Sequence, residues 1–101
     1  MTTAEQTPGG WSTEAPANGQ AVCNSLAVFS DVEKAADTKF PVFIPIRFRT
    51  QIVKGTNYLV NVAVALDECV HVMVYVPCDE GKLTLTGIQY PKTMTDPLVP
   101  F

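Results

Sequence analysis

The chain has 101 residues, of which 47% are hydrophobic, and a formal net charge of −3. This length supports one domain with a modest core, and we predict a single domain over residues 1–101. No stretch approaches the roughly 18 apolar residues that cross a bilayer, so no membrane partner is expected. Because affinity for nucleic acids comes mainly from clustered Lys and Arg, which are lacking here, a nucleic-acid partner is not expected either.

The three cysteines, Cys23, Cys69 and Cys78, are odd in number and form no CxxC pair. This pattern argues against a disulfide framework and against a zinc site, and it fits a reducing compartment. The N-terminus is polar and lacks the basic start and apolar run of a secretory signal. We therefore expect a cytoplasmic protein without a metal or another cofactor.

Proline and glycine punctuate residues 1–19, which predicts an extended segment with a flexible tail over residues 1–10. Trp11 stands beside the Gly9-Gly10 pair, where no local core is available. Its indole either docks back onto the domain or is kept for a partner.

Apolar residues at helical spacing predict one α-helix over about residues 20–35. Asn18 is a suitable N-cap, and Ala21, Ala27 and Ala35 favour helix. The helix is expected to end before Pro41, because proline disfavours helical geometry in the residue ahead of it.

From Ile44 onward, apolar residues alternate with a period of two and predict four β-strands. Pro45 lacks an amide donor, which places it at a strand start, at a bulge or facing outward. Arg47 and Arg49 share a face, where we expect ordinary surface charges. The apolar positions that share a face within each strand are Ile44, Ile46, Phe48 and Ile52; Tyr58, Val60, Val62 and Val64; Val70, Val72, Val74 and Val76; and Leu83 and Leu85.

One helix followed by four strands with short loops predicts an α+β fold, in which an antiparallel sheet packs on the helix. Hairpins in a meander alternate ends. The turns at residues 51–57 and 77–82 should therefore project from one end of the sheet, and the turn at 65–69 from the other.

The stretch QIVKG, residues 51–55, has two interpretations. Its glycine between two strand-like runs is typical of an ordinary hairpin turn, and spacing alone favours that interpretation. The pentapeptide also resembles the central Gln-x-Val-x-Gly motif of the cystatins. Residues 70–75 and 83–87 are similar to the strands on either side of that family's second loop, and Gly9-Gly10 stands where the family keeps its N-terminal glycine.

The resemblance implies a stefin-type cystatin, because no signal peptide and no paired C-terminal cysteines are seen. It implies a cystatin-like sheet of four to five strands wrapped around one helix, with the fifth strand supplied by the tail. It also implies reversible, tight inhibition of papain-like cysteine proteases, including papain and lysosomal cathepsins. The tail and two hairpin loops would enter the protease cleft through Gly9, Gly10, Trp11, Gln51, Ile52, Val53, Lys54, Gly55, Val76, Pro77 and Cys78.

Together, the tail and the two loops would form a wedge. A wedge fills the cleft on both sides of the catalytic thiolate and presents no bond for cleavage. Gly55 allows close backbone approach, and Gln51 and Asn57 are expected to hold the loop by bonding its backbone. Pro77 stiffens the second loop, which lowers the entropy lost on binding. That loop looks shorter and more acidic than in familiar stefins, and it carries Cys78 where they tend to have glycine or a polar residue.

Three further hypotheses come from the residues. Cys69 and His71 lie two apart in a strand, as a cysteine nucleophile and its base would, but we expect a surface histidine beside an ordinary cysteine and no enzyme. The scaffold could instead serve as a non-inhibitory protein-binding module. Finally, the β-branched Val53 would be strained if it bends in the hairpin, and straightening it would convert the monomer into a domain-swapped dimer.

Overall fold

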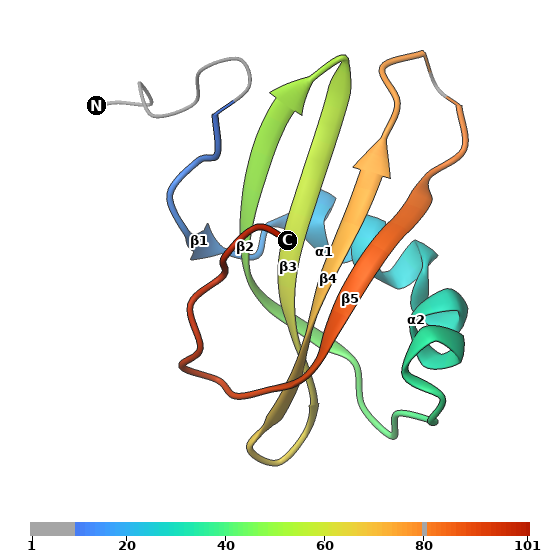
Figure 1. The fold of residues 1–101 in the computed structure, drawn as a ribbon, viewed down its shortest axis with the longest axis vertical. Coiled ribbons are helices and arrows are strands. Elements are labelled where there is room, and N and C mark those ends of the chain that lie inside the picture. The colour runs from blue at the N-terminus through green and yellow to red at the C-terminus, as the bar shows by residue number, and fades with distance from the viewer. Residues whose placement is uncertain (1–9, 80) are drawn as a thin grey trace.

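The computed structural model describes residues 10–79 and 81–101. Its described residues form one five-stranded antiparallel sheet in the order β1-β2-β3-β4-β5, with the helices against one face (Figure 1). The α+β fold class is therefore confirmed, including the short fifth strand before the helices. The elements are β1 (Ala15–Pro16), α1 (Gly19–Ala27), α2 (Phe29–Ala36), β2 (Ile44–Val53), β3 (Gly55–Ala65), β4 (Glu68–Val76) and β5 (Thr84–Lys92).

The predicted helix is present but is interrupted at Val28. Asn18 caps its start as expected, because the Asn18 side chain accepts a 2.8 Å hydrogen bond from the Ala21 amide. The Ser25 hydroxyl donates back to the Ala21 carbonyl at 2.9 Å, and the Val28 amide bonds to the Ser25 carbonyl. Such side-chain bonds to the preceding turn bend helices, which accounts for the break one turn later.

The core lies between the helices and the inner face of the sheet. Val28 and Val32 pack there with Phe40, and the alternating valines of β3 and β4 complete the cluster. The alternation predicted for these strands is thus confirmed, and the fully buried members are Val60, Val62, Val64, Val70, Val72 and Val74.

A register shift between Pro45 and Arg47 marks a bulge in β2. Proline cannot donate to the sheet ladder, so the bulge falls where the sequence leads us to expect it.

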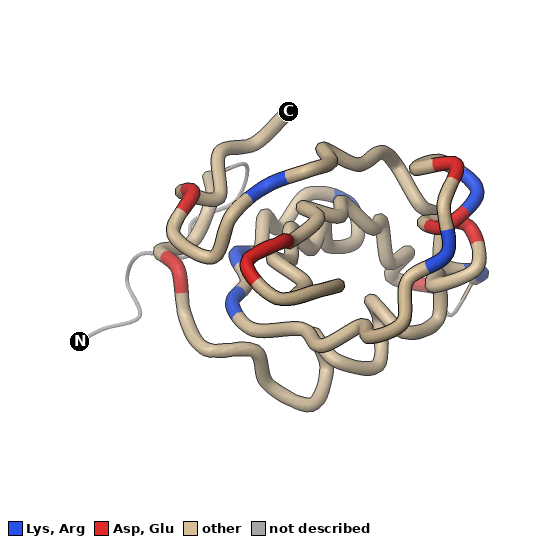
Figure 2. The backbone as a smooth tube through the Cα atoms, turned by 90° about the horizontal axis from the view of Figure 1, so that it is seen from below, with Lys and Arg blue, Asp and Glu red and all other residues tan. Residues whose placement is uncertain are grey.

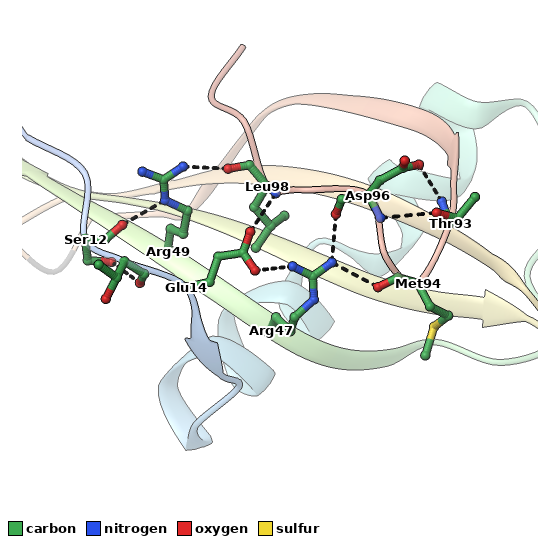
Figure 3. A network of polar contacts seen from close by, with 9 residues as sticks. Ser12, Glu14, Arg47, Arg49, Thr93, Met94, Asp96 and Leu98 are labelled. Carbon is green, nitrogen blue, oxygen red and sulfur yellow. Dashed lines mark hydrogen bonds and ion pairs between the residues drawn. The ribbon is translucent and has the colours of Figure 1, made fainter.

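The outer face of the sheet is partly covered by residues 93–98, which we call the C-terminal strap (Figure 3). Under and beside it, Leu59, Met73 and Leu98 form a second buried cluster. His71 is also fully buried, so the expectation of a surface histidine is wrong. The sequence pattern correctly placed His71 on the outer face but gave no sign that the chain returns across it.

Arg47 and Arg49 are not free surface charges, contrary to expectation. The Arg47 guanidinium pairs with the Glu14 carboxylate and donates to the carbonyls of Met94 (3.1 Å) and Asp96 (2.8 Å) (Figure 3). Arg49 donates to the Leu98 carbonyl at 2.6 Å. The two arginines therefore anchor the strap to β2.

Elsewhere, basic and acidic residues are interspersed around the end of the molecule seen in Figure 2, and no side of that view is given over to one sign. Among the residues placed by the structure, no helix is both long and apolar enough to span a membrane.

Candidate functional site

The first bend joins β2 to β3 and contains the QIVKG stretch. Strand pairing continues up to Val53, which lies opposite Gly55, so the reversal is confined to Lys54 and its neighbours. Gly55 takes the left-handed backbone that the reversal requires, with φ of 113°. Gln51 and Asn57 lie opposite each other and bond side chain to side chain at 2.8 Å, which braces the base of the bend.

The second bend follows Val76 at the end of β4. Its Pro77 is half-buried and its Cys78 is exposed. The Gly81 amide donates to the Asp79 carboxylate at 3.0 Å, and a side chain on Gly81 would come within 3.2 Å of Pro77. The loop thus packs on itself around the proline.

The two bends lie side by side at one end of the sheet, the upper end in Figure 1, as the meander predicts. A Cβ atom on Gly55 would stand only 2.7 Å from the Val76 carbonyl oxygen, so the backbones of the two bends touch. The turn between β3 and β4 lies at the opposite end.

The N-terminal segment reaches the same end of the sheet. Trp11 forms a β-bridge with Gln51, and its side chain packs against the second cluster of Leu59, Met73 and Leu98. Of the two alternatives for Trp11, the structure shows docking onto the domain. Arg49 contributes here as well, because its guanidinium carbon lies 6.0 Å from the indole centroid.

Ser12 fixes the segment to β2 immediately after Trp11. Backbone and side-chain bonds link Ser12 and Thr50, and the Arg49 Nε donates to the Ser12 carbonyl at 2.8 Å. Ser12 is therefore held to β2 close to the first bend.

We call this end of the sheet, with the N-terminal segment beside it, the rim. Three predicted segments meet in it, and Ile52 and Val53 expose 42% and 44% of their surface. Gly9 lies outside the described residues. The described members of the rim are Gly10, Trp11, Gln51, Ile52, Val53, Lys54, Gly55, Val76, Pro77 and Cys78.

The Cys69–His71 pair lacks the properties of a catalytic dyad. Burial raises the pKa of the Cys69 thiol, and that thiol donates to the Met94 sulfur at 3.2 Å. Burial also lowers the pKa of His71 to about 4, so the imidazole is neutral at pH 7. Neither group is exposed, whereas a nucleophile needs an accessible thiolate.

Comparison with known proteins agrees with this geometry. The Cystatin domain family matches residues 19–94. The chain belongs to the cystatin family. It is 38% identical to Cystatin-B of Oplegnathus fasciatus over 84 residues, which cover 81% of this chain and 82% of that protein. It is 36% identical to Stefin-C of Bos taurus over 95 residues, covering 92% and 94%, and 38% identical to Cystatin-B of Homo sapiens over 76 residues, covering 73% and 78%.

This cystatin is of the stefin type, as the resemblance implied. Cystatins are protease inhibitors and not enzymes, so the chain is an inhibitor, and the hypothesis of a non-inhibitory module is set aside. Sequence reasoning missed Tyr75, whose hydroxyl donates to the Lys54 carbonyl, and Arg49, which donates to the Ser12 carbonyl. The shared face of Arg47 and Arg49 was the available signal, because two adjacent guanidinium groups on a half-covered face can anchor carbonyls.

Proposed function

We propose that this cystatin inhibits papain-like cysteine proteases by inserting the rim into their active-site cleft. The observation that carries the proposal is the contact between the first bend at Gly55 and the second bend at Val76, with Trp11 bridged to the same hairpin. The rim presents the backbone of its two bends together with the exposed apolar side chains of Ile52 and Val53.

Preformed geometry supports tight binding. The Gln51–Asn57 pair, the packing of Pro77 against Gly81 and the docking of Trp11 all reduce the freedom that binding would remove. An interface of about 800 Å² per partner supports nanomolar affinity, roughly −12 kcal/mol, when its parts are preorganised. Ile52 and Val53 supply the exposed apolar surface at its centre.

Titration of papain tests the function directly. We expect one equivalent of this cystatin to abolish papain activity, and full recovery of intact inhibitor from the complex. Papain whose catalytic cysteine is carboxymethylated should still bind, because the wedge makes no bond to the thiolate. Papain that keeps its activity in micromolar inhibitor would contradict the proposal.

The Val53 side chain is the most direct test of the first bend. Replacing Val53 by Asp should weaken papain inhibition by about 1–3 kcal/mol, or roughly 5- to 140-fold, because a carboxylate would lose its water in the cleft. Inhibition constants measured at fixed ionic strength check this.

Val42→Asp is the matched control for that substitution. Val42 is exposed to 42%, nearly the same as Val53, but it precedes β2 at the other end of the strand. It should inhibit like the parent. Equal inhibition constants for both variants and the parent would remove Val53 from the interface.

Finer features of the partners are also proposals. We infer that lysosomal cathepsins are among the targets, and that the protein works in the cytoplasm, where its free thiols Cys23, Cys69 and Cys78 would stay reduced. The monomer is the active form. A domain-swapped dimer would open the first bend, where the left-handed backbone falls on Gly55 while Val53 still pairs within β2 and β3.

A further inference from the structure

A side chain near the end of β4 contacts the first bend. This residue lies outside the cystatin motif QIVKG. Tyr75 lies opposite Asn57 in the β3–β4 register, two residues beyond Gly55 along β3. Its side chain extends past this partner, and its hydroxyl donates to the carbonyl of Lys54 at the tip of the bend.

The acceptor is a group that the sheet itself does not pair. Val53 and Gly55 are opposite each other in the β2–β3 ladder, and Lys54 lies between the two strands. A carbonyl at such a reversal bonds either to water or to a group outside the ladder. Tyr75 provides one from the neighbouring strand, and so ties the tip of the bend to β4.

The glycine of the motif is adapted to this contact. A Cβ atom on Gly55 would lie 2.6 Å from the Tyr75 hydroxyl oxygen and 2.9 Å from its ring. The absence of a side chain at Gly55 therefore lets the tyrosine cross beneath the bend. Close approach to a protease is a second use of the same glycine.

Tyr75 also immediately precedes Val76, where the second bend begins. The hydroxyl thus connects the tip of one bend to the base of the other. A bond at this place holds the relative position of the two bends, although both are exposed to solvent at their tips.

We propose that Tyr75 is a positioning residue for inhibition: its hydroxyl locks the two bends of the rim into one rigid unit before the protease is met. This inference rests on the proposed function. The residue need not touch the protease; it acts through the Lys54 carbonyl and lowers the freedom that binding would otherwise remove.

Tyr75→Phe removes the hydroxyl and keeps the ring. We expect dissociation from carboxymethylated papain to be about three- to tenfold faster, the scale of one lost hydrogen bond, with the association rate within about twofold of the parent. Amide hydrogen exchange at residues 53–56 should accelerate in the free variant, while the melting temperature stays close to that of the parent.

Tyr90→Phe is the control, since Tyr90 is near the far end of β5 and packs against Phe40. It should leave both the dissociation rate and the exchange at residues 53–56 unchanged. Parent-like dissociation of Tyr75→Phe, or equal acceleration in both variants, would overturn the inference. If the parent itself fails to bind papain, the proposed function falls, whereas the exchange measurement still decides whether Tyr75 holds the bend.

Discussion

Replacing Gly55 by alanine is expected to weaken papain inhibition by about 2–4 kcal/mol, or roughly 30- to 700-fold. Two features of the structure act together. The φ of 113° is one that side chains rarely adopt, and the new methyl group would lie 2.7 Å from the backbone oxygen of Val76. A backbone oxygen cannot rotate away, so the first bend must move off the second. Inhibition constants measure the loss of affinity for papain, and thermal unfolding measures the loss of stability in the variant.

Gly19→Ala is the control for the same chemical change. Gly19 begins α1, and an added methyl group there meets no atom within 4 Å. This variant should inhibit like the parent. If Gly55→Ala also does so, then neither the backbone conformation nor the contact with Val76 matters for the protease.

Acid is expected to destabilise the fold by up to about 3 kcal/mol between pH 6.5 and 4 through His71 alone. Burial, with the nearby cations Lys92 and Arg47, lowers the pKa of His71 from 6.5 to about 4, and the nearby carboxylates of Asp96 and Glu14 oppose this only in part. Between these pH values His71 is protonated in the unfolded chain but remains neutral in the folded chain. The free energy of unfolding therefore falls as the pH falls.

Denaturant unfolding at a series of pH values measures this slope. His71→Gln is neutral at every pH and should flatten the slope between pH 6.5 and 5. The chain contains one histidine, so its ring proton signals also report the titration directly by NMR. An imidazole that titrates near pH 6.5 in the folded protein would contradict the assignment.

Glu14 titrates at lower pH than the unfolded-state histidine, so its effect on stability can be separated from that of His71. The backbone amide of Leu98 donates to its carboxylate and, together with Arg47, holds its pKa below the usual 4.5. Its stabilisation is present above that value and is lost as the pH falls below it. Glu14→Gln should therefore leave the slope between pH 6.5 and 5 intact and change only the more acidic part of the curve.

Local patterns predicted most of the fold. Alternating valines fixed the inner faces of β3 and β4, Asn18 the start of α1, and Pro45 the bulge of β2. The break at Val28 was missed because it depends on the Ser25 hydroxyl bonding the Ala21 carbonyl in the preceding turn. Helix propensity does not show whether a serine makes this bond or points to solvent.

The site was predicted less completely. The meander correctly placed the two bends at one end, and the motif drew attention to Gly55. The burial of His71 and the role of Arg49 were missed, because both depend on where the C-terminal strap lies. A strap of irregular backbone has no period in its sequence, so its path follows only from contacts between residues about 50 positions apart along the chain.

The turn between β3 and β4 has a practical use. Leu66 at its tip exposes 93% of its surface, and the turn lies at the end of the sheet away from the rim. A dye, an affinity peptide or a sensor surface attached there would leave the rim unobstructed.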